Sequence, residues 1–237
     1  MRFSGHQREP DDVNELMSRR ARGSRTIMMV LIVAAIAVVG RESGFFGPTV
    51  DGRSLTTVDQ AALEERLAAA GPLLIEGNSE GDVTIIELFD YRCPHCRRMA
   101  PVIQDLVDSD PGIRLVLVEY PILGPESDTA AKFAVAAANQ DAYGPFHRAL
   151  MYSTVTWTEA AMVELAESLG LDSQKLREDA NSPETAAILS AYRAAAREDG
   201  IDSTPAFIVG DALFIGTLDE PTLRELVRMA RSDAGAD

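Results

Sequence analysis

Two cysteines, Cys93 and Cys96, have the clearest chemical potential and are the only cysteines in the chain. Pro94 and His95 separate them, and proline at this position favours the first turn of a helix. Side chains three positions apart share one side of a helix, so the two sulfurs can form a disulfide. At the helix start, Cys93 faces unpaired backbone amides and the positive end of the helix dipole, and His95 adds positive charge. We therefore expect a low pKa at Cys93 and an oxidising disulfide.

Two other uses of a cysteine pair fit this sequence less well. A zinc site needs four ligands, and the only histidines are His6, His95 and His147. A purely structural disulfide across so short a loop would remove little entropy from the unfolded chain. The chain has 237 residues, of which 46% are hydrophobic, so it can bury a full core without a covalent staple. We favour a reversible redox dithiol that needs no metal and no cofactor.

The net charge argues against nucleic-acid partners. The formal charge is -15, and residues 1–40 contribute six arginines against four acidic residues, a balance of +2. The remainder therefore carries -15 - 2 = -17, which repels phosphate backbones and predicts no basic patch that could release counterions. The sequence also lacks a Walker-type phosphate loop and a Gly-x-Gly-x-x-Gly turn. Nucleotide chemistry is therefore not expected.

An uncharged apolar segment, residues 26–40, follows four arginines and has the pattern of an export signal. As a helix it would span about 22 Å, short of the ~30 Å hydrocarbon core but suitable for a signal peptide or an anchor. The long polar region before it, and the lack of a small-x-small site just after it, favour an uncleaved anchor. Residues 1–25 are predicted to be a disordered cytoplasmic tail. The acidic body is predicted to lie outside, in an oxidising compartment.

The first half of the acidic body is predicted to contain a strand-helix-strand unit. Residues 41–72 are predicted to be a linker followed by a short amphipathic helix. Residues 82–91 and 113–120 are rich in β-branched and apolar side chains, as buried strands are. Between them lies the helix that begins at the cysteine pair, and this order normally makes the two strands parallel neighbours.

The second half begins with a helical block, residues 127–199, in which no strand pattern occurs. Within this block His147 and Trp157 are predicted to be packing residues. Residues 206–209 and 213–215 flank a Gly-Asp-Ala turn and predict an antiparallel hairpin, with a last helix after it. The complete order is β-α-β, a helical block and β-β-α, which indicates an α/β fold.

Two motifs make a family resemblance specific. Cys93-Pro94-His95-Cys96 follows a Glu-Leu-Phe-Asp-Tyr strand, and Ser203-Thr204-Pro205-Ala206-Phe207 precedes the hairpin. In these features residues 73–231 resemble the DsbA-like thiol:disulfide oxidoreductases of the bacterial cell envelope. The resemblance implies a thioredoxin fold formed by residues 73–126 and 200–231. Residues 127–199 would then be an inserted helical domain, in agreement with the predicted order.

The resemblance also implies roles for the four residues of the first motif. Cys93 is the implied nucleophile, which forms a mixed disulfide with the substrate. Cys96 is the implied buried resolving thiol. Pro94 and His95 are implied to tune the reduction potential.

Three further residues match the family's active site. Pro205 matches the cis-proline that sits against the disulfide, and the backbone next to Thr204 is implied to hold substrate as an added strand. Glu87 matches the acidic residue beneath the redox pair, where it assists proton movement at the resolving cysteine. The best-known oxidase of the family has valine before the cis-proline, whereas Thr204 is typical of isomerases and other branches. This departure leaves the direction of electron flow open.

We therefore predict an envelope thiol:disulfide oxidoreductase that exchanges its Cys93–Cys96 disulfide with cysteines of exported proteins as an oxidase. One alternative is an isomerase or reductase that works from the dithiol form. The other is a binding protein, a copper carrier or chaperone with the dithiol as soft ligands. The expected partners are reduced exported proteins and a membrane or soluble protein that resets the disulfide. The expected location is the periplasm, with an inner-membrane anchor or after signal cleavage.

Overall fold

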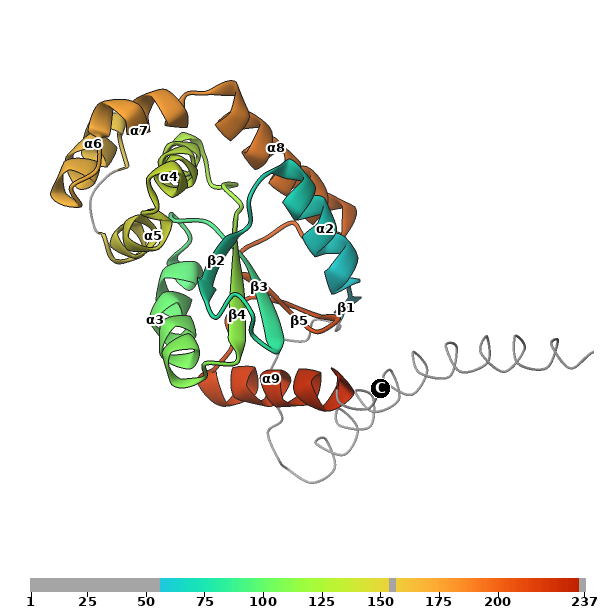
Figure 1. Cartoon of the computed structure of the whole chain (residues 1–237). Coiled ribbons are helices and arrows are strands. Elements are labelled where there is room, and N and C mark those ends of the chain that lie inside the picture. The colour runs from blue at the N-terminus through green and yellow to red at the C-terminus, as the bar shows by residue number, and fades with distance from the viewer. Residues whose placement is uncertain (1–55, 154–156, 235–237) are drawn as a thin grey trace, which may run out of the picture. The chain divides into compact units, whose positions relative to one another are not determined.

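The computed structural model describes residues 56–153 and 157–234. The predicted cytoplasmic tail, the apolar segment and the first part of the linker lie outside the described residues. Among the residues described, no helix has the length and apolar character to cross a membrane. These residues form a mixed sheet of six strands with helices on both faces (Figure 1).

The centre of the sheet is the predicted strand-helix-strand unit and hairpin. The strand order is β1-β6-β5-β3-β4-β2. Strand β3 (Val83–Phe89) pairs in parallel with β4 (Ile113–Glu119) and antiparallel with β5 (Ala206–Val209), which forms the hairpin with β6 (Ala212–Ile215). Six of the seven residues in each of β3 and β4 are buried, because both faces of these strands are covered by helices.

Two short edge strands extend the sheet beyond the prediction. Strand β2 (Leu74–Gly77) pairs with β4, and β1 (Thr56–Thr57) pairs with β6. Residues 56 and 57 belong to the segment 41–72 that was predicted as a linker and an amphipathic helix, and they form a strand that is too short to show an alternating pattern. The predicted amphipathic helix is α2 (Gln60–Ala70), which buries Leu63 and Leu67. The apolar side of α2 is therefore already covered within this chain.

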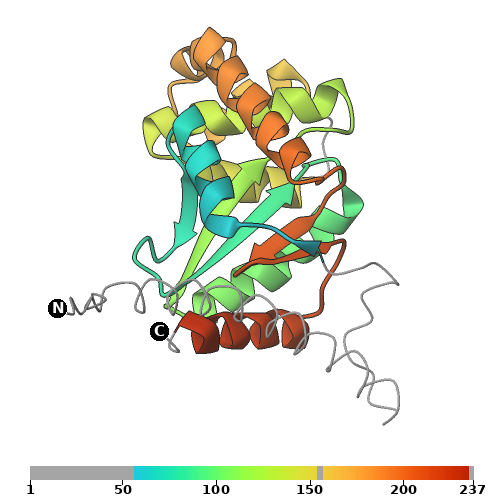
Figure 2. The same cartoon turned by 90° about the vertical axis from the view of Figure 1, so that its right-hand side faces the viewer.

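Helices pack in pairs on the two faces of the sheet. Helix α3 (Pro94–Ser109) contacts α9 (Glu220–Ala234) on one face, and α2 contacts α8 (Pro183–Glu198) on the other. Figure 2 shows α2 and α8 in front of the strands, with α3 behind them. Helix α3 buries Met99 and Ile103, which are four positions apart on its sheet-facing side. This packing fixes the helix that carries the cysteine pair.

Between β4 and β5 the described chain is helical, as predicted. The elements are α4 (Pro125–Ala137), the 3-10 turn η1 (Ala138–Gln140), α5 (Tyr143–Tyr152), α6 (Glu159–Ser168), α7 (Ser173–Ala180) and α8. Helix α4 contacts α5, α6, α7 and α8 and is the centre of this block. Small side chains such as Ala130 and Ala134 are fully buried, which lets the neighbouring helices approach closely.

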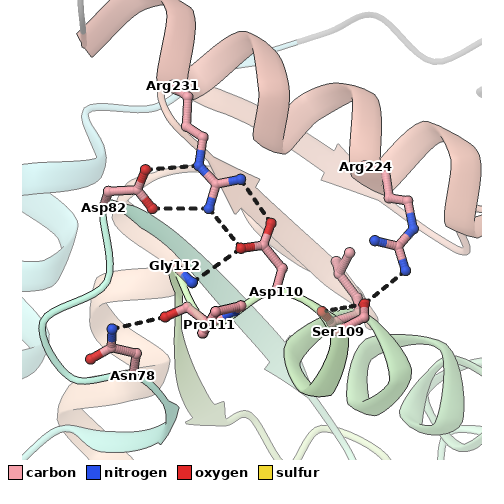
Figure 3. Close-up of polar contacts among 9 residues, drawn as sticks. Asn78, Asp82, Ser109, Asp110, Pro111, Gly112, Arg224 and Arg231 are labelled. Carbon is pink, nitrogen blue, oxygen red and sulfur yellow. Dashed lines mark hydrogen bonds and ion pairs between the residues drawn. The ribbon is translucent and has the colours of Figure 1, made fainter.

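Arg231 on α9 fastens the starts of the two parallel strands. Its guanidinium binds Asp82, just before β3, and Asp110, just before β4, at 2.7 to 2.9 Å. Figure 3 shows Arg231 between the two carboxylates, and the Gly112 N–H donating to Asp110. Hydrogen bonding to Arg231 lowers the pKa of both carboxyl groups. The clamp lies at the end of the sheet opposite to the cysteines, which follow the carboxyl end of β3.

Candidate active site

The cysteine pair lies at the start of α3, shortly after the end of β3. Cys93 is the N-cap of α3, and Pro94 occupies the first turn, where a proline costs no helical hydrogen bond. The Cys93 side chain is 4% exposed, and Cys96 is fully buried. Both cysteines are free thiols in this structure. Of the two cysteines, only Cys93 therefore retains any exposure to solvent.

The contacts around Cys93 favour its thiolate. The Cys96 N–H donates to the Cys93 Sγ atom at 3.4 Å. The pKa of Cys93 is lowered to about 5, first by a hydrogen bond from the Cys96 side chain and then by the backbone N–H of Cys96, with smaller contributions from Thr204 and the backbone of His95. Burial opposes this shift but does not overcome it. Cys93 is therefore ionised at neutral pH.

Cys96 has the opposite character. Burial raises the pKa of the Cys96 thiol far above its ordinary value, and the hydrogen bond with Cys93 raises it further. Because the pKa values of the two thiols differ so strongly, Cys93 leaves readily as a thiolate, whereas Cys96 must receive a proton when the disulfide opens.

His95 acts on Cys93 through its backbone. Its N–H is one of the groups that lower the pKa of Cys93. The exposed imidazole instead contacts Arg98, with 2.7 Å between the Arg98 Nη2 and His95 Nδ1 atoms. A guanidinium only donates hydrogen bonds, so Nδ1 is the acceptor in this contact. Arg98 brings a positive charge next to this imidazole.

The Thr204–Pro205 loop lies directly against Cys93. The peptide bond between these residues is cis, as the resemblance implies. The Cys93 thiol, when protonated, donates to the Thr204 carbonyl oxygen at 3.3 Å. Pairing of β5 with β3, in which Ala206 lies opposite Leu88, brings the loop to the redox pair across more than a hundred residues of sequence.

Glu87 on β3 is a buried carboxyl group without a partner. It is 3% exposed, and its Oε1 atom has no hydrogen bond within the described part of the chain. Burial, and to a smaller extent the charge of Cys93, raises the pKa of Glu87 to about 8. The group lines a cavity of about 20 Å³ together with His147 and Arg148, enough for about one water molecule. The charge of Glu87 also raises the pKa of Cys96, so the two groups are electrostatically coupled.

A buried polar network behind the redox pair was not evident from the sequence. Glu119, at the end of β4, is 1% exposed and accepts hydrogen bonds from the hydroxyl groups of Tyr91 and Tyr143 at 2.7 and 3.0 Å. The Tyr91 hydroxyl also lies 3.1 Å from His147 Nδ1. Burial lowers the pKa of His147 to about 3, so this predicted packing residue is a neutral member of the network. The one feature of the sequence that could have indicated this network is Glu119, a charged residue at the end of a mostly apolar strand.

Arg97 connects the cysteine helix to the helical block. Its guanidinium lies 5.4 Å from the centre of the Trp157 ring and donates to the Ser153 carbonyl oxygen. Trp157 is 6% exposed, as expected of a packing residue, but it packs on α3 as well as on its own block. The residue after Cys96 is therefore held by the segment between α5 and α6.

Known proteins with similar sequences and structures agree with this geometry. A family model described as thioredoxin matches residues 70–228. The chain belongs to the thioredoxin family. A thioredoxin-like oxidoreductase from Silicibacter pomeroyi is 43% identical with a TM-score of 0.65, and the match covers 68% of this chain and 92% of that chain. The thiol-disulfide exchange protein alpha-DsbA2 from Wolbachia pipientis, 24% identical with a TM-score of 0.63, shares the fold over 71% of this chain and 96% of its own. The predicted resemblance is confirmed.

A curated relative of this thioredoxin-family chain has a much longer sequence. It is the Na(+)/H(+) antiporter NhaA 3 from Salinispora tropica, 28% identical over 162 residues, which are 68% of this chain and 25% of the relative. The chain thus spans about a quarter of the length of the curated relatives that it matches.

Proposed function

We propose that this thioredoxin-family chain is a thiol:disulfide oxidoreductase that oxidises cysteine pairs in exported proteins. The observation that carries the proposal is the opposed acidity of two adjacent thiols. The pKa of Cys93 is lowered to about 5, whereas the pKa of Cys96 is raised. A stable thiolate stabilises the reduced form of the pair, and the disulfide form therefore oxidises other thiols readily.

The reaction starts from the Cys93–Cys96 disulfide. A substrate thiolate attacks the Cys93 Sγ atom, the bond between the two cysteines breaks, and Cys96 leaves with the electron pair and takes up a proton. A second substrate thiolate then attacks the substrate sulfur of the mixed disulfide and displaces Cys93 as a stable thiolate. Two electrons pass from the substrate to the cysteine pair, and the substrate gains one disulfide.

Glu87 and the Thr204–Pro205 loop assist this reaction. Glu87 keeps a proton at neutral pH, because its pKa is raised to about 8, and in our proposal it exchanges that proton with Cys96, to which it is electrostatically coupled. The backbone at Thr204 is next to Cys93, and we assign to it the pairing with an extended substrate segment. Pro94 and His95 set the start of α3, on which the low pKa of Cys93 depends.

The proposed location is the periplasm. The basic residues followed by an apolar segment at positions 26–40 support export, either with an inner-membrane anchor or with a cleaved signal. A membrane or soluble partner would then reoxidise the cysteine pair after each cycle.

Thr204 is the observation that favours a second candidate, an isomerase or reductase that works from the dithiol form. The two directions differ in the redox state of the pair in the cell, which alkylation with a mass tag reports. An oxidase is held mostly as the disulfide and an isomerase mostly as the dithiol. A copper carrier is the candidate of a different class, and stoichiometric Cu(I) binding that survives a strong chelator, without oxidase activity, would identify it.

Titration of the full chain against glutathione tests the leading proposal. At pH 7, a Cys93 pKa of about 5 stabilises the dithiol form by ~2 pKa units, which corresponds to ~60 mV, or ~30 mV if solvent screens half of it. Added to the ~-270 mV of thioredoxin, this shift predicts a potential between ~-240 and ~-210 mV and rapid oxidation of a reduced test protein. A potential near ~-270 mV, with no oxidation of the test protein, would overturn the oxidase assignment.

A further inference from the structure

A groove of about 520 Å³ lies between α4 and α8, over the loop that follows β4. Pro121 belongs to its floor, Asp128 and Lys132 line it from α4, and Arg193 and Arg197 line it from α8. The two helices contact one another and belong to the helical block (Figure 1). The volume lies in the range of sites that hold a ligand of several residues or rings.

The groove is basic, although the sequence predicted no basic patch. Three cations and one carboxylate line it, a local balance of +3 - 1 = +2 in a chain of net charge -15. On each helix the charged pair is four positions apart and so shares one face. Lys132 comes from α4, whereas Arg193 and Arg197 come from α8, so only the fold brings them together.

Two of the three cations have unused hydrogen-bond donors. Arg193 binds Asp128 and also donates to the Pro121 carbonyl oxygen at 3.3 Å. Lys132 and Arg197, by contrast, form no ion pair and no side-chain hydrogen bond with another residue in the described ranges 56–153 and 157–234. The groove therefore offers two cations with free donors, Lys132 and Arg197, in addition to the paired Arg193.

The floor of the groove is fastened to the active-site strand. Asp90, three residues before Cys93, accepts hydrogen bonds from the backbone N–H groups of Ile122 and Leu123 at 2.8 and 2.9 Å. The guanidinium of Arg92 also donates to the Leu123 carbonyl oxygen. The loop after β4 and the loop that leads to Cys93 thus form one hydrogen-bonded surface at the carboxyl ends of β3 and β4.

We propose that this groove binds an acidic segment of the polypeptide with which Cys93 exchanges its disulfide. The proposal rests on the proposed function, because it names a feature of the substrate. An acidic partner is repelled by most of this chain, so a local region of opposite charge at the end of the sheet that carries the redox pair orients its approach. Carboxylates meet the free donors of Lys132 and Arg197, and the acidic segment lies in the groove while a neighbouring cysteine reaches Cys93.

Binding to a fluorescent oligoglutamate peptide that lacks cysteine tests the site without the redox reaction. The full chain should raise the anisotropy of this peptide and leave an oligoglutamine peptide of the same length free. Raising the ionic strength from ~0.05 to ~0.5 M should weaken the binding at least tenfold, because the contacts are solvent-accessible. Equal binding of the two peptides, or retention of vesicles with anionic lipid without peptide binding, would overturn the proposal.

Charge reversal locates the binding. The double variant Lys132→Glu with Arg197→Glu should weaken oligoglutamate binding at least tenfold. Its matched control, Lys175→Glu with Arg228→Glu, changes the net charge equally on α7 and α9 and should weaken it less than threefold. A similar loss in both variants would show a general charge effect and would refute the groove. Asp128→Asn removes the one carboxylate of the groove and should tighten binding, provided that thermal unfolding shows each variant folded.

Exchange kinetics separate this proposal from the proposed function. Two dithiol peptides that differ only in an acidic or a glutamine tail are oxidised by the full chain. The acidic tail should raise kcat/KM at least fivefold, and this advantage should vanish in the Lys132→Glu, Arg197→Glu variant. If both peptides are oxidised at the same rate, the groove proposal fails and the oxidoreductase stands. If neither is oxidised but oligoglutamate still binds, the proposed function fails instead.

Discussion

Replacement of Glu87 by leucine should stabilise the fold in a pH-dependent way. The wild-type carboxyl is ionised above its ordinary pKa in the unfolded chain, but in the folded chain its pKa is raised to about 8. A raised pKa means that the folded state binds the proton more tightly, so stability is fully present below pH ~4.5 and falls as the pH rises to ~8. Replacing Glu87 by leucine removes this pH-dependent loss of stability.

The size of the effect follows from the shift. At pH 7 the difference from the ordinary value of 4.5 is ~2.5 pKa units, or roughly 3 kcal/mol in the free energy of unfolding. Glu87→Leu should therefore gain about 3 kcal/mol more at pH 7 than at pH ~4.5. It should also remove the cost of the unpartnered Oε1 atom, which is present at every pH.

Urea unfolding of the dithiol form between pH ~4.5 and ~8 measures this difference. Glu87→Gln is the matched control, because it removes the ionisation but keeps a polar atom in the same place. Both variants should lose the pH-dependent penalty, and the leucine variant should be the more stable of the two. In contrast, resolution of mixed disulfides by Cys96 should slow at least ~10-fold in both. A stability difference between wild type and variant that does not change with pH would refute the burial argument.

Three further outcomes are expected. Alkylation of Cys93 by iodoacetamide should follow a titration with its midpoint near pH 5, because the measured rate reports the thiolate and the pKa is lowered to about 5; a midpoint near ~8.5 contradicts this. Thr204→Val should raise the pKa of Cys93 and make the potential more negative by ~30 mV per pKa unit, whereas Thr204→Ser should leave both nearly unchanged. Arg231→Ala should lower the unfolding temperature above pH ~4 without changing the potential. Because the pKa of Asp110 is lowered in the folded chain, its ion pair with Arg231 stabilises the fold at pH values above the ordinary pKa of an aspartate, and this stabilisation is lost as the pH falls.

Features with a local signal were predictable from the sequence. The Cys93-Pro94-His95-Cys96 motif and the helix after it follow from spacing and from the proline in the first turn. Strands β3 and β4 are rich in β-branched and apolar residues, and the helical block has no strand pattern in its described part. These predictions need only the few residues around each element.

Features assembled from distant residues were not predictable. Strand β1 has two residues and exists because β6 offers a free edge to it. Glu119, at the end of β4, is bound by Tyr91 from the loop after β3 and by Tyr143 from the start of α5, and these segments have separate local patterns. Only packing shows that Lys132 and Arg197 line one groove. In each case the feature is stabilised by tertiary contacts between distant residues, and the spacing of residues along the chain does not predict such contacts.

The clamp at Arg231 has a consequence for how this domain can be connected to other parts of a protein. It holds the last turns of α9 over the amino ends of β3 and β4, so the described chain ends on the side away from Cys93. A seven-residue strand separates the two ends by ~23 Å. A fusion, a label or a surface attached behind α9 would therefore leave the thiol face open to incoming polypeptides.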